Sequence, residues 1–137
     1  MAMLNVEGPR GLLNPSRIVV TSSDDSWREL TSRGDTQDYD ITKFEDYKNG
    51  DTIDTFDYMR VSLAQKGSPD ASTARHYRIE TYFNNNGDTF NLDTNTLENN
   101  ERVKFERLTN TTFKATASEI TSNRIVIGFI EFIKSAS

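Results

Sequence analysis

The feature that most constrains the fold is the apolar segment near the C-terminus, residues 123–134. On a β-strand, successive side chains point to opposite sides, so a half-buried strand alternates apolar with polar residues. This segment is apolar on both sides, with Ile125, Ile127, Phe129 and Ile133 on one and Val126, Ile130 and Phe132 on the other. A strand of this kind has to be covered on both sides. The sequence therefore predicts a strand that packs on its own core and on something else.

The rest of the chain shows the period-two alternation of half-buried strands, interrupted by turn residues about every 8–12 positions. The 52–65 segment also fits helical spacing, but its β-branched and aromatic residues favour a strand. About seven to eight short strands predict an all-β fold, an antiparallel, jelly-roll-like β-sandwich. Unequal strand lengths favour a sandwich over a closed barrel. The predicted strands are 16–21, 38–44, 52–65, 75–83, 89–94, 101–108, 112–117 and 123–134.

Two shorter signals lie between these strands. Residues 22–33 are predicted to form one short helix, because Ser26 and Glu29 have capping-box spacing and Gly34 can end the helix. Asn49-Gly50 is a strong signal for a two-residue hairpin turn, since both central positions of a type I′ turn need a positive φ.

An extended arm is predicted at the N-terminus, over residues 1–15, followed by one β-sandwich domain over residues 16–137. Glycine and proline interrupt the arm and remove the hydrogen bonds of a helix or a central strand. Its apolar content is too low for the arm to fold alone. We therefore expect the arm and the C-terminal strand to be held by neighbouring subunits, through Leu4, Val6, Leu12, Leu13, Ile130 and Phe132.

Composition excludes several classes of protein. The 137 residues include no cysteine, which removes disulfide scaffolds, cysteine-bound zinc, iron–sulfur clusters and thiol catalysis. The net charge of −5 argues against nucleic acid as the main ligand. No apolar stretch reaches the ~20 residues of a membrane span, and we expect no signal peptide. The expected location is a virion or, before assembly, the cytoplasm, with no membrane partner.

Residues suited to catalysis are sparse. The single histidine, His76, falls on the polar side of a predicted strand, where we expect it to be exposed and solvated. The nucleophile elbow Gly-x-Ser-x-Gly does not occur. The asparagine-rich turn at residues 84–88 lacks the ligand spacing of an EF-hand, so no metal site and no cofactor are predicted. We therefore expect the protein not to be an enzyme.

The acidic excess is densest from Asp35 to Asp57, a stretch that also carries tyrosine and asparagine. Tyrosine and asparagine on loops suit sugar stacking and protein interfaces, because they offer flat area together with a hydrogen-bonding group. Acidic loops of this kind can converge at one end of a sandwich. The candidate binding residues are Tyr39, Asp46, Tyr47, Asn49 and Asp51.

Two further patterns have simpler explanations. Arg33-Gly34-Asp35 resembles the integrin-recognition tripeptide, but the likeness covers three residues and Gly34 as a helix stop explains it. Basic residues also cluster around two phenylalanines. A half-exposed strand carries such a row on its solvated side, so no nucleic-acid site is predicted. The basic residues are Arg102, Lys104, Arg107 and Lys114.

These observations support two functional hypotheses. The first is a non-enzymatic structural or assembly protein, a subunit of a virus or phage particle that associates with itself or with other particle subunits. The second is a β-sandwich module that binds carbohydrate or a host receptor through its acidic loops. The first is preferred, because a lone copy of the domain would leave its C-terminal strand partly uncovered.

Overall fold

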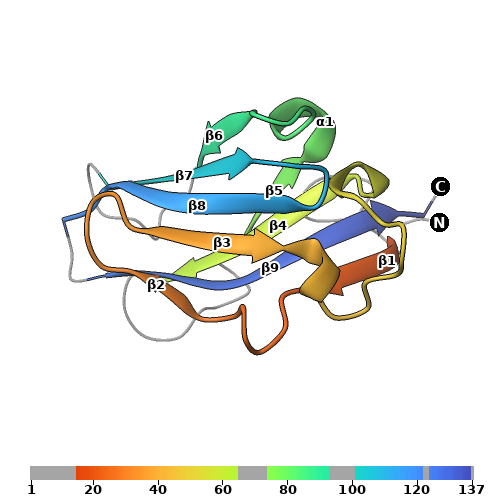
Figure 1. The fold of residues 1–137 in the computed structure, drawn as a ribbon, viewed down its shortest axis with the longest axis horizontal. Helices are drawn as coiled ribbons and strands as arrows, with labels where there is room; N and C mark the ends of the chain where they lie inside the picture. The colour runs from red at the N-terminus through yellow and green to blue at the C-terminus, as the bar shows by residue number, and fades with distance from the viewer. Residues whose placement is uncertain (1–14, 65–73, 93–100, 122–123, 137) are drawn as a thin grey trace.

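The C-terminal strand β9 (Ile125–Ser135) is the central strand of one sheet. The computed structural model describes residues 15–64, 74–92, 101–121 and 124–136. In this sheet, β4 (Tyr58–Ala64) pairs along one edge of β9. The strands β1 (Pro15–Val20) and β2 (Arg28–Leu30) pair one after the other along its opposite edge. β5 (Arg75–Arg78) pairs with β4 and completes the five-stranded sheet A (Figure 1). The chain itself therefore occupies both edges of β9.

Sheet B forms the second layer (Figure 1). Its four strands pair antiparallel with their neighbours, as those of sheet A do. The predicted all-β sandwich is confirmed, with nine strands among the described residues. The strand order in sheet B is β3 (Thr36–Asp40), β8 (Thr112–Glu119), β7 (Arg102–Arg107) and β6 (Thr89–Asn91).

The core between the sheets is centred on Phe113 of β8. Its ring stacks on Tyr39 of β3, with 5.0 Å between ring centroids, and meets Phe132 of β9 edge-on at 5.5 Å. Phe113 and Phe132 are fully buried. Burying one such ring contributes about 2–3 kcal/mol to folding, so this contact is a main attachment between the two layers.

One extra residue in β9 changes the expected division of its side chains. Ser62 of β4 pairs with Phe129 and Leu63 with Ile127, which leaves Gly128 without an opposite residue. A bulge of this kind reverses the alternation of side chains. The prediction that Ile127 and Phe129 share a side is therefore wrong. The core receives Ile125, Ile127, Ile130 and Phe132, and the outer side of sheet A receives Val126, Phe129, Glu131 and Ile133.

The predicted helix at residues 22–33 is also wrong. That segment makes turns and then enters β2, where Leu30 pairs with Ile125 and is fully buried. Pairing with β9 outweighs the capping-box spacing, because local helix signals are weak compared with tertiary contacts. The α-helix in the described part of the chain is the four-residue α1 (Ile79–Tyr82), which ends the strand expected over residues 75–83.

Two other predicted strands are shortened by 3-10 turns. The turn η1 (Ile41–Lys43) follows β3 directly and is capped by Asp40, whose carboxylate accepts from the Thr42 N–H at 3.0 Å. The turn η2 (Ile53–Thr55) precedes β4. Gly50 has the expected positive φ, 97°, but the chain continues into η2 instead of a hairpin strand.

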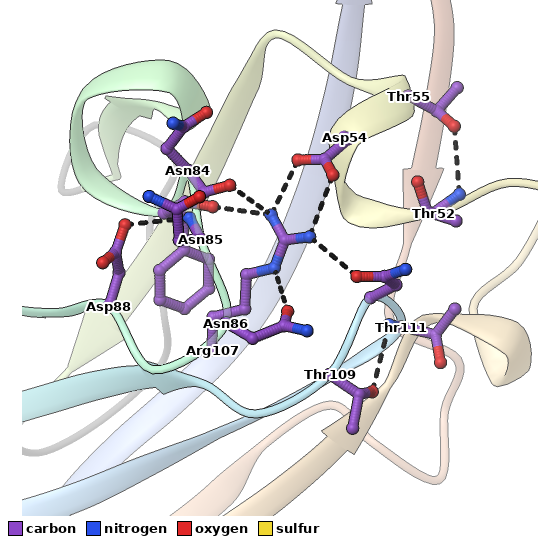
Figure 2. Close-up of polar contacts among 12 residues, drawn as sticks. Thr52, Asp54, Thr55, Asn84, Asn85, Asn86, Asp88, Arg107, Thr109 and Thr111 are labelled. Carbon is purple, nitrogen blue, oxygen red and sulfur yellow. Dashed lines mark hydrogen bonds and ion pairs between the residues drawn. The ribbon is translucent and has the colours of Figure 1, made fainter.

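A buried arginine fastens the turns at one end of the sandwich (Figure 2). Arg107, the last residue of β7, is 1% exposed. Its guanidinium donates to both carboxylate oxygens of Asp54, at 2.7 and 3.0 Å, and to the Asn86 side chain at 2.8 Å. It also donates to the Phe83 carbonyl at 2.8 Å and to the Asn110 side chain at 3.3 Å. One side chain thus joins η2, the turn after α1 and the turn between β7 and β8.

Candidate functional site

The outer side of sheet A carries three arginines that lie over aromatic rings. One of them, Arg124 over Trp27, is placed on this side by its ion pair with Glu29. Glu29 lies opposite the outward-facing Val126 in the β2–β9 register. An arginine over a ring is held by the electrostatic attraction between the cation and the π-system. The distances from guanidinium carbon to ring centroid are 5.3 Å for Arg60 over Phe129, 5.0 Å for Arg78 over Tyr58 and 5.9 Å for Arg124 over Trp27. We call these six residues the aromatic–arginine face.

Each arginine of this face also makes a charged or polar contact. Arg60 pairs with Glu131 of β9 at 2.8 Å, and Arg124 pairs with Glu29 at 2.6 Å. Arg78 donates to the hydroxyl of Tyr58 at 2.8 Å. These contacts hold the guanidinium planes in place. Arg78 and Trp27 are exposed and Arg60, Arg124 and Phe129 are partly buried, whereas Tyr58 is 4% exposed and holds Arg78 without offering surface of its own.

His76 belongs to the same side of sheet A, because it pairs with Arg60 across β4 and β5. It is partly buried, so the expectation that it is fully exposed is wrong. Burial, followed by the positive charge of Arg60, lowers the pKa of His76 to about 4. The imidazole is therefore neutral at neutral pH and adds no charge to the face.

A hollow of about 500 Å³ lies beside β1, and we call it the β1 hollow. Arg17 and Ile18 of β1 line it, together with Asp46, Tyr47 and Lys48 from the turn that follows η1. A β-bridge joins this turn to β1. Two segments that are distant in the sequence thus form one concave surface.

Arg17 and Asp51 form the frame of the β1 hollow. The Arg17 guanidinium donates to both carboxylate oxygens of Asp51, at 2.9 and 2.7 Å, and this contact is the main reason that the pKa of Asp51 is lowered. The Lys48 N–H donates to the same carboxylate at 3.0 Å, and the Tyr47 hydroxyl donates to the Asp51 carbonyl at 3.1 Å. The frame therefore fixes the backbone and the ring that line the hollow.

Asp46 is held in an unusual backbone conformation. Its φ of 69° lies in the left-handed region, which aspartate tolerates better than most side chains. Arg17 donates to the Asp46 carbonyl at 3.1 Å and so supports this conformation. Within the described residues, no hydrogen bond or ion pair involves the Asp46 carboxylate or the Lys48 ammonium group. Both groups are available to a ligand.

The structure brings some of the five predicted binding residues together and separates others. Asp46 and Tyr47 line the β1 hollow, and Asp51 belongs to its frame. Asn49 is exposed in the neighbouring turn but does not line the hollow. Tyr39 is not a surface residue: it is 2% exposed and stacks on Phe113 in the core, so this assignment is wrong.

The predicted interface residues fall into two groups. Leu4, Val6, Leu12 and Leu13 lie outside the described residues. Ile130 and Phe132 are fully buried in the core between the sheets. Because the bulge at Gly128 turns both side chains inward, they cannot contact another subunit while the sandwich is folded, and this part of the prediction is wrong.

The tripeptide Arg33-Gly34-Asp35 forms a local turn. The Asp35 carboxylate accepts hydrogen bonds from the backbone N–H groups of Thr31 at 2.8 Å and Ser32 at 2.9 Å, and these bonds lower its pKa. The carboxylate is thus engaged with its own turn. The hydrogen bonds from Thr31 and Ser32 therefore account for Asp35 at this position through the geometry of the turn.

Sequence reasoning missed both the burial of Arg107 and the aromatic–arginine face. Arg107, expected in a solvated basic row, is buried by partners from three turns that no local pattern connects. The face joins residues of β4, β5 and β9 with Trp27, so it exists only once sheet A is paired. The alternation of arginine with aromatic residues in β4 and β5 is the signal that could have indicated it.

No protein-family description, no curated protein and no solved structure matches this chain. Within residues 15–64, 74–92, 101–121 and 124–136, no cluster of three or more histidine, aspartate or glutamate side chains is arranged to hold a metal ion. The helices in that part of the chain are too short to cross a membrane.

Proposed function

We propose that the protein is a non-enzymatic structural subunit of a virus or phage particle, such as a capsid, decoration or tail component, and that it assembles through the aromatic–arginine face. The three arginine–aromatic pairs on the outer side of sheet A carry this proposal. Tryptophan, tyrosine and arginine are the residue types that dominate the energetics of protein interfaces. Here they are grouped on one side of one sheet.

The edges of the two sheets favour contact through this face over pairing of strands between copies. Val20 bridges the free edge of β1 to Glu45. At the β3 edge, the Gln37 side chain donates to the Glu29 carbonyl at 2.9 Å and accepts from Arg28 at 2.8 Å. The outer strands β5 and β6 are four and three residues long. Short or covered edges discourage the addition of a further strand.

A second copy of the chain offers a charge complementary to Arg78, the arginine of the face that makes no ion pair within the described residues. Eight acidic residues and two lysines lie between Asp35 and Asp57. This acidic segment spans β3, η1 and η2, and β3 belongs to the sheet opposite the aromatic–arginine face (Figure 1). A contact between the arginine side of one copy and the acidic segment of the next is head-to-tail, and such contacts build rings or filaments.

Sedimentation velocity at about 50 mM and about 500 mM salt tests this arrangement, because screening weakens contacts between exposed charges. We expect oligomers of the wild-type protein at low salt that dissociate at high salt. Arg78→Glu on the face and Asp38→Lys on β3 should each reduce association. A mixture of the two variants should form a complex of two chains, since one intact face meets one intact acidic segment.

Lys104→Glu is the matched control, because it also reverses a charge but lies on β7, in the opposite sheet and outside the acidic segment. It should associate like the wild type. A wild-type chain that stays monomeric at about 100 µM would contradict the proposal, since assembly from free subunits requires a Kd below that concentration. Association that neither charge reversal changes would also contradict it.

A further inference from the structure

The β1 hollow combines apolar surface with two charged groups that make no hydrogen bond or ion pair within the described residues. Ile18 is 37% exposed, and the partly buried Tyr47 lines the same hollow. Asp46 supplies a carboxylate and Lys48 an ammonium group, neither of which is hydrogen-bonded or ion-paired within the described residues. We infer that this hollow binds a neutral saccharide.

A sugar ring matches this combination of groups. One face of a pyranose is lined by C–H groups, which pack on apolar and aromatic side chains such as Ile18 and Tyr47. Its hydroxyls both donate and accept hydrogen bonds, so one can donate to the Asp46 carboxylate while another accepts from Lys48. The volume of about 500 Å³ lies within the usual range of small-molecule sites.

Anionic ligands fit the hollow less well. The terminal nitrogens of Arg17 already donate to the Asp51 carboxylate and to the Asp46 carbonyl. Lys48 is then the cation of the lining that makes no ion pair within the described residues, and the Asp46 carboxylate beside it repels a phosphate, sulfate or carboxylate group. The lining therefore favours a ligand that carries hydroxyls and no charge.

The frame behind the hollow reduces the cost of binding. Arg17, Tyr47 and the Lys48 backbone are all hydrogen-bonded to Asp51 before any ligand arrives. A ligand therefore has few protein groups to order, which favours affinity. None of the five lining residues belongs to the aromatic–arginine face, whereas Asp46 and Lys48 lie within the acidic segment. Arg78→Glu should therefore reduce assembly and leave sugar binding unchanged, which separates the two proposals.

An immobilised glycan array that carries neutral, sialylated and sulfated oligosaccharides tests the inference with the full-length protein. We expect retention on neutral glycans. The best neutral glycan is then titrated into isotope-labelled protein by NMR, with shifts expected at Ile18, Tyr47 and Lys48. Asp46→Asn keeps the size and the backbone tolerance of the residue but removes its charge. This variant and Lys48→Ala should each weaken binding about tenfold, the effect of losing one hydrogen bond to a charged group.

Asp24→Asn in the turn before β2 and Lys104→Ala on β7 are the matched controls, since they remove the same charges away from the hollow and outside the acidic segment. Both should bind the neutral glycan like the wild type. Circular dichroism verifies that each variant is folded. The inference is overturned if no neutral glycan is retained, if only anionic glycans bind, or if folded Asp46→Asn and Lys48→Ala bind with unchanged affinity.

Discussion

The guanidinium of Arg107 donates two hydrogen bonds to the carboxylate of Asp54, of 2.7 and 3.0 Å. The two side chains nevertheless differ widely in their exposure to solvent. The Arg107 side chain is 2% exposed and the Asp54 side chain 54% exposed. The hydrogen bond from Arg107 is the main reason that the pKa of Asp54 is lowered. A solvated carboxylate therefore neutralises a buried cation, and β7 is held to η2 by this contact.

Replacing Arg107 should lower the free energy of unfolding of the protein. Arg107→Met retains an apolar stem but leaves the buried Phe83 carbonyl without its donor, while the exposed Asn86 and Asn110 side chains can bind water. An unpaired buried polar group costs about 1–3 kcal/mol, so we expect the free energy of unfolding to fall by about that amount. Urea denaturation measures this change. Arg102→Met, at an exposed position of the same strand, should stay within about 0.5 kcal/mol of the wild type. Equal losses for the two variants would contradict the structural role of Arg107.

Tyr39→Phe should stabilise the protein. The Tyr39 hydroxyl is buried and has no hydrogen-bond partner in the described part of the chain, and burial raises its pKa. Removing an unpaired buried hydroxyl eliminates a desolvation penalty of about 1–3 kcal/mol while the ring still stacks on Phe113. Thermal denaturation should show a higher Tm. Tyr82→Phe, at an exposed ring, serves as the comparison and should change the Tm little. A lower Tm for Tyr39→Phe would show that the hydroxyl has a partner.

His76 should make the protein less stable in mild acid. Its pKa in the folded protein is about 4, below the ordinary value of 6.5 that applies to the unfolded chain. Between these values the unfolded chain binds a proton that the folded protein does not, so the free energy of unfolding falls as the pH falls. His76→Gln should lose less stability than the wild type between pH 6.5 and 4. Urea denaturation along a pH series measures the difference. Parallel curves for the two proteins would contradict the lowered pKa.

Gly50→Ala should destabilise the turn before η2. Gly50 has a φ of 97°, which L-residues rarely adopt, and a Cβ placed there meets no atom within 4 Å. The cost is therefore a backbone cost of about 1 kcal/mol, without any steric clash. Urea denaturation should show a lower midpoint with an unchanged m-value. Asn49→Ala, next to it at an exposed position, should have a smaller effect.

The β-sandwich could be predicted because alternation and turn residues are local patterns. Predicted strands such as 101–108 and 112–117 correspond closely to β7 and β8. The helix over 22–33 could not be corrected from sequence, because β2 forms through its pairing with β9, about 100 positions away. The same holds for the bulge at Gly128, which depends on the register with β4.

The candidate site was predictable only in part. Asp46 and Tyr47 were found from the density of acidic and tyrosine residues, and both line the β1 hollow. Arg17 and Ile18 complete the hollow from β1, and no local pattern relates them to a turn near residue 46. Tyr39 was misassigned because alternation in a short strand does not say which side faces the core.

The position of β9 in the chain has a consequence for the order of folding. The strands of sheet B lie within residues 36–119 and pair only with one another. In sheet A, by contrast, β1, β2 and β4 share residues 125–135 as their common partner, and β1 and β2 are separated from it by about 100 positions. Pairing between such distant segments is slow, so sheet A should be completed last, and the apolar side chains of β1, β2 and β4 stay exposed to aggregation until β9 docks.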